Sequence, residues 1–474
     1  MKKTTISFLL AILSIASFSQ AVKVEGDWLG TLDVGVKLRL VLHVKSDSTG
    51  SYSATLDSPD QGAKGIPVSS INITGDSLHV ELKMINGKYE GAFTNDTTVT
   101  GSWSQGLALA ALTLKKTKEV ITINRPQTPK PPFSYSSNEV EYSNADNSVH
   151  FGGTFTYPSS GGPFPTAILI TGSGQQDRDQ TIFGHKPFAV IADYLTQRGF
   201  AVLRVDDRGT GKTTGEVMKA TSFDFAKDVE AALAFLKKQP QTDTGRLGLI
   251  GHSEGALIAA LVASRRKDIN FMVLMAAPGV KGDDLLVDQA GAVFKAEGIS
   301  PTTTNLYKPF YSQMMTISVT EKDTAVAFKK AWTAYTKWKL LAPGLNRNEL
   351  GFTDDVTAAK MIQGLVHSFS VPWMKYFIQT DAAKLLEKTS AKVLAMNGEK
   401  DVQVLAKPNL AGIIVALQKS KSKVYDIKML QNLNHLFQRC VKCSVSEYGQ
   451  LEETINPEAL IVLGNWLQKN VSSK

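Results

Sequence analysis

The feature that most constrains the fold is a five-residue turn, GHSEG (251–255), between an apolar strand and a helix of small residues. Glycines on both sides of Ser253 permit a sharp strand-to-helix turn, where a larger side chain would collide with adjacent elements. Such a turn lifts the serine hydroxyl above the sheet and places it at the positive end of a helix. We therefore predict that Ser253 is a nucleophile rather than an ordinary serine in a glycine-rich loop.

Strands and helices alternate around this turn. Strands are expected at 167–170, 200–205, 246–250, 271–276, 392–396 and 424–429, and helices at 223–238, 256–266 and 457–469. This alternation predicts a mostly parallel sheet flanked by helices on both faces, over 138–474. Residues 279–390 interrupt it with helical patterning and many aromatic side chains. An insertion of this length predicts a helical cap, whose aromatic and methionine residues fit either an apolar substrate pocket or the cap's own core.

The N-terminal region has a different pattern. Residues 22–120 alternate apolar and polar side chains with period two, for example from Leu38 to Val44. This predicts a small all-β domain, either a barrel or a sandwich. The motifs GDW (26–28) and GSW (101–103) each place a tryptophan at the start of a strand. The favoured interpretation is that both tryptophans pack in the core. The motifs also resemble, more weakly, the first strand of lipocalin-like barrels. The proline-rich stretch 121–137 predicts an extended linker.

The first 21 residues have the features of a signal peptide. Two lysines precede an apolar run from Ile6 to Ile15, and small residues follow up to Ala21. We expect export to the periplasm or the extracellular space, without stable membrane insertion, because the run is short for a membrane span. The formal net charge of +8 is spread along the chain, which favours solubility over nucleic-acid binding. The sequence is compatible with either a monomer or a homo-oligomer.

The two cysteines, Cys440 and Cys443, form a C-x-x-C motif. In an exported protein a local disulfide is the favoured interpretation, and free thiols are the alternative. A zinc site would need two further ligands, and a thioredoxin-like redox site would need its own βαβ context. Neither context is evident around this motif.

A serine nucleophile needs a base, and the base needs a carboxylate to hold its tautomer. In α/β-hydrolases these groups follow one another in the order serine, acid, histidine. Two histidines come after Ser253: His435 lies on a loop after the last strand and is the predicted base, whereas His367 lies within the cap. Asp401, just after the strand at 392–396, is the predicted acid. Glu399 competes with it but is expected to face solvent.

Attack on a carbonyl also needs donors for the oxyanion. The backbone N–H of Glu254 is the first, and the loop TGSGQQDRD (171–179) supplies the second through Ser173 or Gly174, with Gln175 as an alternative. The charged clusters at 177–179 and 206–208 are expected to pin two loops. A carboxylate pair for glycoside or metal chemistry is the less favoured interpretation.

Together with GSGQQDRD, DDRGTGK (206–212), PWMKYF (372–377), NGEKD and NHLFQ (434–438), the turn resembles secreted bacterial α/β-hydrolases, related to prolyl-oligopeptidase-like and dienelactone-hydrolase-like enzymes. These look like serine esterases with a β-rich domain ahead of the catalytic one. The resemblance implies an α/β-hydrolase fold and hydrolysis of a small-molecule ester through Ser253, His435 and Asp401, without a metal or an organic cofactor. Two departures are Thr171, where a histidine is usual, and the C-x-x-C motif after His435.

Two other functions remain open on the sequence. A serine peptidase of the prolyl-oligopeptidase type would use the same order of catalytic groups on small peptides. Such enzymes often carry a β-propeller, for which the region 22–120 is too short. A binding module, in which the β domain holds glycans or lipids, is the second alternative.

Overall fold

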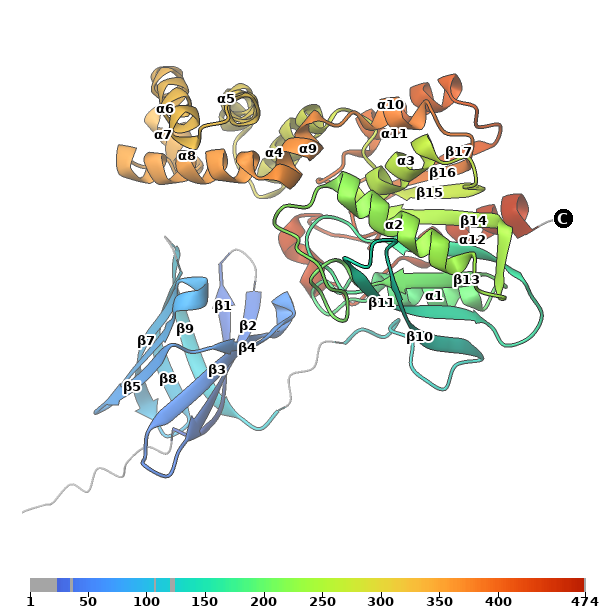
Figure 1. Cartoon of the computed structure of the whole chain (residues 1–474). Coiled ribbons are helices and arrows are strands. Elements are labelled where there is room, and N and C mark those ends of the chain that lie inside the picture. The colour runs from blue at the N-terminus through green and yellow to red at the C-terminus, as the bar shows by residue number, and fades with distance from the viewer. Residues whose placement is uncertain (1–23, 35–36, 106–107, 120–123, 473–474) are drawn as a thin grey trace, which may run out of the picture. The chain divides into compact units, whose positions relative to one another are not determined.

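A computed structural model of the chain describes residues 24–34, 37–105, 108–119 and 124–472. The predicted signal peptide lies outside these residues. The chain divides into two compact units, residues 1–122 (unit 1) and 123–474 (unit 2). Figure 1 shows the elements of both units.

Unit 1 contains one antiparallel sheet in the order β4-β3-β2-β1-β9-β8-β7-β6-β5. Its side chains alternate as the sequence predicts, and the inward set forms a single apolar core that contains Trp28 and Trp103. Both tryptophans are thus core residues, as expected. The strands are Gly26–Asp33 (β1), Lys37–Ser46 (β2), Tyr52–Ser58 (β3), Ala63–Pro67 (β4), Ser70–Thr74 (β5), Ser77–Leu82 (β6), Gly87–Asn95 (β7), Thr98–Gln105 (β8) and Ala108–Thr117 (β9).

The sheet of unit 1 curls so that its two edges approach each other. Strands β4 and β5 are the two edges, and they are joined by Val68 and Ser69. The Val68 N–H donates to the carbonyl of Ala54 in β3, and the Ser69 N–H donates to the carbonyl of Glu81 in β6. One connection therefore bonds to both ends of the sheet. Unit 1 is accordingly a half-barrel formed by one curled sheet, rather than a sandwich of two.

Unit 2 is built on an eight-stranded sheet in the order β10-β11-β13-β12-β14-β15-β16-β17. The pairs β10–β11 and β11–β13 are antiparallel and the others are parallel, which is the strand arrangement of the α/β-hydrolase fold. The strands are Tyr135–Ser143 (β10), His150–Pro158 (β11), Phe164–Ile170 (β12), Ala201–Val205 (β13), Thr242–His252 (β14), Phe271–Met275 (β15), Lys392–Gly398 (β16) and Tyr425–Leu430 (β17).

Helices cover both faces of this sheet, as the alternating pattern predicts. Apolar residues of α1 (Pro187–Thr196) and α12 (Pro457–Leu467) pack with one face. Those of α2 (Ser222–Leu236), α3 (Glu254–Arg265) and α11 (Ala406–Lys419) pack with the other. The parallel strands consequently end together at one edge of the sheet, where the loops after β12, β14 and β16 meet.

The segment expected to be a linker, 121–137, is attached to unit 2 over its described part. The guanidinium of Arg125 donates to the carbonyl oxygens of Phe183, Gly449 and Leu451. Strand β10 then begins at Tyr135, inside the expected linker. The sequence concealed this strand because most of its side chains are only partly buried or exposed, so no apolar period marks it.

The insertion between β15 and β16 is helical, as expected. It comprises α4 (Gly282–Ala296), α5 (Pro301–Thr320), α6 (Thr324–Leu341), α7 (Gly344–Glu349), α8 (Asp355–Ser370), α9 (Pro372–Gln379) and α10 (Ala382–Leu386). Helices α5, α6 and α8 pack against one another (Figure 1). Their core buries six aromatic residues together with Met314 and Met315, namely Tyr307, Phe310, Tyr335, Trp338, Phe352 and Phe369. These methionines therefore serve the packing of the cap itself. None of the helices in the described ranges is both long and apolar enough to cross a membrane.

Candidate active site

Ser253 lies at the turn between β14 and α3, in a backbone conformation that side-chain-bearing residues seldom adopt. Its φ is 56° and its ψ is −121°. The Ser253 N–H donates to the carbonyl of Met275 at the end of β15, which anchors the turn to the neighbouring strand. A non-glycine residue at positive φ costs about 1–3 kcal/mol, which the surrounding structure must offset. Such strain is found where a side chain has to be held in one place.

The two glycines of the turn are required by close packing. A Cβ on Gly251 would lie 2.2 Å from the carbonyl oxygen of Gly255, and one on Gly255 would lie 2.1 Å from that of Ile170. Both distances are far inside van der Waals contact with backbone atoms that have no room to move. The structure thus provides the physical reason for the G-x-S-x-G spacing.

His435 and Asp401 form a buried pair. Nδ1 of His435 is 2.8 Å from Oδ2 of Asp401, and the two side chains are 5% and 0% exposed. The other oxygen of Asp401 accepts the backbone N–H groups of Gln403 and Val404, both at 2.8 Å. Asp401 is therefore held from both sides, and its carboxylate orients the imidazole. Because Nδ1 faces the carboxylate, Nε2 is the nitrogen available to accept a proton.

The competing residues lie elsewhere. Glu399 is only partly buried, accepts the backbone N–H of Asn432 and pairs with Lys400. His367 is exposed in the last turn of α8.

His252, which precedes the serine, connects it to His435. Its Nε2 lies 2.9 Å from the backbone carbonyl of His435 and therefore donates to it, and its Nδ1 accepts from the Gln180 amide at 2.8 Å. The two imidazole rings have centroids 4.7 Å apart. Burial lowers the pKa of His252 to about 3, so this ring is neutral. Since His252 is the residue next to Ser253, this bond connects His435 to the Ser253 turn.

The loop after β12 lies directly against the serine. A Cβ on Gly172 would be 3.3 Å from the Cβ of Ser253. The Thr171 hydroxyl, at the position where a histidine is usual, donates to Asp207 at 2.6 Å. Burial raises the pKa of Asp207 to about 7. Ser173 and Gly174, the predicted oxyanion donors, follow in the same loop. Glu254, as the first residue of α3, has an N–H without an intrahelical acceptor.

The Glu254 side chain joins three elements around this site. Its carboxylate is buried and accepts from the Ser222 hydroxyl at 2.6 Å and from the Trp373 indole at 2.7 Å. The Ser173 hydroxyl also bonds to it, and burial raises its pKa. Trp373 belongs to α9 and Ser222 to α2, so one carboxyl links the cap, a sheet-covering helix and the loop after β12.

Sequence reasoning assigned no role to the side chains of His252, Glu254, Ser222 or Trp373. The sequence does mark three of these positions, because His252 and Glu254 belong to GHSEG (251–255) and Trp373 to PWMKYF (372–377). The contacts themselves join residues 32 to 183 positions apart. No local pattern could have shown them.

The charged clusters act as structural pins, as expected. Arg178 donates to both oxygens of Asp206 through its side chain and pairs with Glu139. Arg204 pairs with Asp179, and Arg208 pairs with Asp228. These bonds tie the loops after β12 and β13 to each other and to neighbouring elements.

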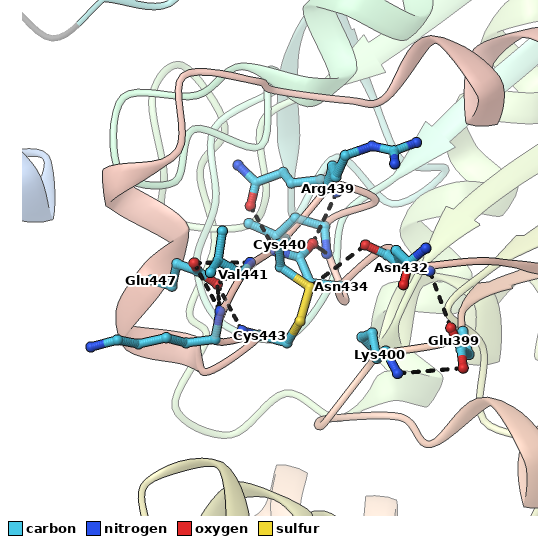
Figure 2. Close-up of a disulfide and its surroundings, with 12 residues drawn as sticks. Glu399, Lys400, Asn432, Asn434, Arg439, Cys440, Val441, Cys443 and Glu447 are labelled. Atoms are coloured by element: carbon cyan, nitrogen blue, oxygen red, sulfur yellow. Dashed lines mark hydrogen bonds and ion pairs between the residues drawn. A yellow bond between two sulfur atoms is a disulfide. The ribbon is translucent and has the colours of Figure 1, made fainter.

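Cys440 and Cys443 are joined by a disulfide on the segment that follows His435 (Figure 2). The Glu447 carboxylate accepts the backbone N–H groups of Val441, Lys442 and Cys443. Among the described residues, Cys440, Cys443 and Glu447 are the one group with three potential metal ligands close together. Both sulfurs are bonded in the disulfide, and the Glu447 carboxylate accepts hydrogen bonds from backbone groups. This arrangement therefore stabilises the loop.

Comparison with known proteins adds relatives to this geometry. The family model described as "Serine aminopeptidase, S33" matches residues 186–344. Esterase EstD of Thermotoga maritima is 32% identical over 137 residues, which make up 29% of this chain and 32% of that protein. The chain thus spans about a third of the length of this relative.

Solved structures similar to the chain include an esterase, Pf2001, of Pyrococcus furiosus, with a TM-score of 0.42 and 16% identity over 74% of this chain and 98% of that one. Another is the α/β hydrolase GrgF of Penicillium sp. sh18, with a TM-score of 0.42 and 14% identity over 71% of this chain and 100% of that one.

Proposed function

We propose that this protein is an exported serine hydrolase that cleaves small-molecule carboxylic esters through an acyl-enzyme on Ser253. The observation that carries the proposal is the strained Ser253 turn, held by His252 beside the buried His435–Asp401 pair. The match to the serine aminopeptidase model and the similarity to esterase EstD support it. The disulfide and the N-terminal sequence support export, because disulfides persist in oxidising compartments.

The proposed reaction needs only these groups and water. The Ser253 Oγ attacks the ester carbonyl carbon while Nε2 of His435 takes its proton, and Asp401 stabilises the resulting imidazolium. The N–H of Glu254 and an amide of Ser173 or Gly174 bind the oxyanion. The C–O bond to the alcohol breaks, and His435 returns the proton to the departing oxygen. Water then attacks the acyl-enzyme in the same way, which releases the carboxylic acid and regenerates the serine.

A peptidase is the second candidate, because the matching family model carries the description of an aminopeptidase. The same nucleophile, base and oxyanion donors would act on an amide. The two functions differ in the leaving group, which for an amide must be protonated before it departs. An assay that varies the leaving group therefore distinguishes the two functions.

The test uses the purified mature protein with p-nitrophenyl esters of graded acyl length and a panel of aminoacyl-p-nitroanilides. We expect ester cleavage with a preferred acyl length, and its loss by about 10³-fold or more in Ser253→Ala. Turnover of the anilides in preference to the esters would assign the protein to the peptidases. Ester cleavage that persists in Ser253→Ala would refute the proposed nucleophile.

A further inference from the structure

We propose that unit 1 is a binding domain for a single-chain acyl amphiphile, such as a medium-chain fatty acid, which it holds in a cavity at one end of the half-barrel. This inference depends only on unit 1 and not on the activity proposed for unit 2. It assigns a function to the β domain that the catalytic geometry leaves without one.

The first observation is the cavity itself. It has a volume of about 480 Å³ and is walled by aliphatic side chains of β1 to β4, including Leu32, Leu38, Leu56 and Ile66. Pockets for small molecules usually have volumes of ~300–1,000 Å³ and predominantly apolar walls. The mouth of a β-barrel is also a recurrent place for them. Size and lining therefore suit a ligand with an alkyl chain.

The cavity is bounded below by close-packed core. Trp103, Leu40 and Leu56 line it and also line a void of only about 10 Å³ deeper in the half-barrel. That smaller void has no room for a chain. The ligand tail must therefore end near Trp103, which favours a medium-length acyl group over a long one.

The polar groups of the cavity can bind the head of an amphiphile. Gln61 and Gln105 line it and are themselves exposed to solvent. A carboxylate or ester carbonyl oxygen can accept a hydrogen bond from the amide N–H groups of these two side chains.

The third observation is the distribution of exposed apolar side chains. In the described residues of unit 1, the large hydrophobic side chains classed as exposed are Val34, Met84 and Leu109, at 44%, 71% and 74%. Val34 lines the cavity and Met84 precedes the lining residue Ile85. Leu109 pairs with Ser104, which alternates with the lining residues Trp103 and Gln105, so Leu109 lies on the other face of the sheet. Val34 thus adds exposed apolar surface to the cavity wall.

The first test measures laurate binding to the full mature chain by isothermal titration calorimetry, at concentrations below micelle formation. Ala63→Trp would fill the cavity, since Ala63 lines it, and Lys64→Trp places the same side chain on the next, exposed residue. We expect saturable binding with one site, weakened at least tenfold in Ala63→Trp and changed less than twofold in Lys64→Trp. Equal affinity in all three proteins, or no binding to the parent, would overturn the proposal.

A second measurement guards against misfolding of the filled variant. Bromine quenches an indole that it contacts, so 12-bromododecanoate should quench part of the tryptophan fluorescence of the unaltered chain. We expect most of that quenching to disappear in Trp103→Phe. Quenching that persists in this variant would place the ligand away from Trp103, near Trp28 or a tryptophan of unit 2, and would overturn the proposal. Ester hydrolysis by Ser253 enters neither readout, so this proposal and the proposed function can fail separately.

Discussion

At the scale of single residues, backbone strain and close packing determine which amino acids the Ser253 turn can contain. The positive φ of the serine requires neighbours that hold it there, and the glycines at 251 and 255 are needed because backbone atoms lie about 2 Å from where a Cβ would be. The side chain of His252, which sequence reasoning passed over, then fixes the position of His435. The turn is therefore a unit of five residues, each with its own physical requirement.

The assignment of the acid can be tested by a matched pair of variants. Asp401→Asn should lower kcat by about 10³-fold or more, because the amide no longer stabilises the His435 tautomer or its cation. Glu399→Gln should change kcat less than twofold, because the Glu399 side chain bonds to Asn432 and Lys400. Steady-state kinetics on a p-nitrophenyl ester measures both. Similar losses in the two variants would contradict the assignment.

Asp207 leads to a prediction about pH. Burial raises its pKa from 3.8 to about 7, so in this window the folded chain retains a proton that the unfolded chain releases. The free energy of unfolding should therefore fall as pH rises from about 4 to 7. Asp207→Asn imitates the neutral acid and should be stabilised relative to the parent at pH 8 but not at pH 4. Thermal melting of both proteins across this range measures the difference, and a difference independent of pH would refute it.

At the scale of elements, the buried core of unit 2 could be predicted and its borders could not. Strands β12 to β17 carry apolar runs that sequence reasoning located within a few residues, because both faces of a parallel sheet are covered. The hairpin of β10 and β11 was missed: β10 is an edge strand with little burial, and glycines interrupt β11. Periodicity reports burial, so an exposed edge leaves no signal.

The contact between α9 and the nucleophile turn predicts an effect of the cap on catalysis. Trp373→Phe removes the indole donor from the buried Glu254 carboxylate. The carboxyl keeps its bonds to Ser222 and Ser173, but α9 loses its hydrogen bond to the Ser253 turn. A hydrogen bond contributes about 1 kcal/mol, so we expect kcat/KM to fall about fivefold. Trp332→Phe, in α6 and within the cap core, is the control and should leave kcat/KM within twofold. If kcat/KM changes equally in both variants, the contact between Trp373 and Glu254 does not couple the cap to the activity.

At the scale of the whole molecule, export and the disulfide should be detectable in the same sample. We expect the protein recovered from the periplasm or medium of an expressing bacterium to begin close to residue 22. Its two cysteines should resist thiol alkylation until a reductant is added. Intact-mass spectrometry with and without reduction measures both. A chain that retains Met1 and carries two alkylated cysteines without reduction would contradict the prediction.

The sequence by itself determined the two kinds of architecture and the order of Ser253, Asp401 and His435 along the chain. These follow from local causes, namely the period of apolar side chains, the glycines of one turn and the strand-to-loop positions of the polar residues. The sequence also predicted a disulfide between Cys440 and Cys443, which are three residues apart.

Only the tertiary structure decided how these parts meet. It placed Trp373 of the cap on the carboxylate of Glu254, tied His252 to the backbone of His435, and curled nine strands of unit 1 into a half-barrel with an open cavity. Each of these contacts joins segments far apart in the chain. Packing, together with the free-energy cost of burying an unpaired polar group, decides which residues meet in these contacts. A local sequence pattern reports neither.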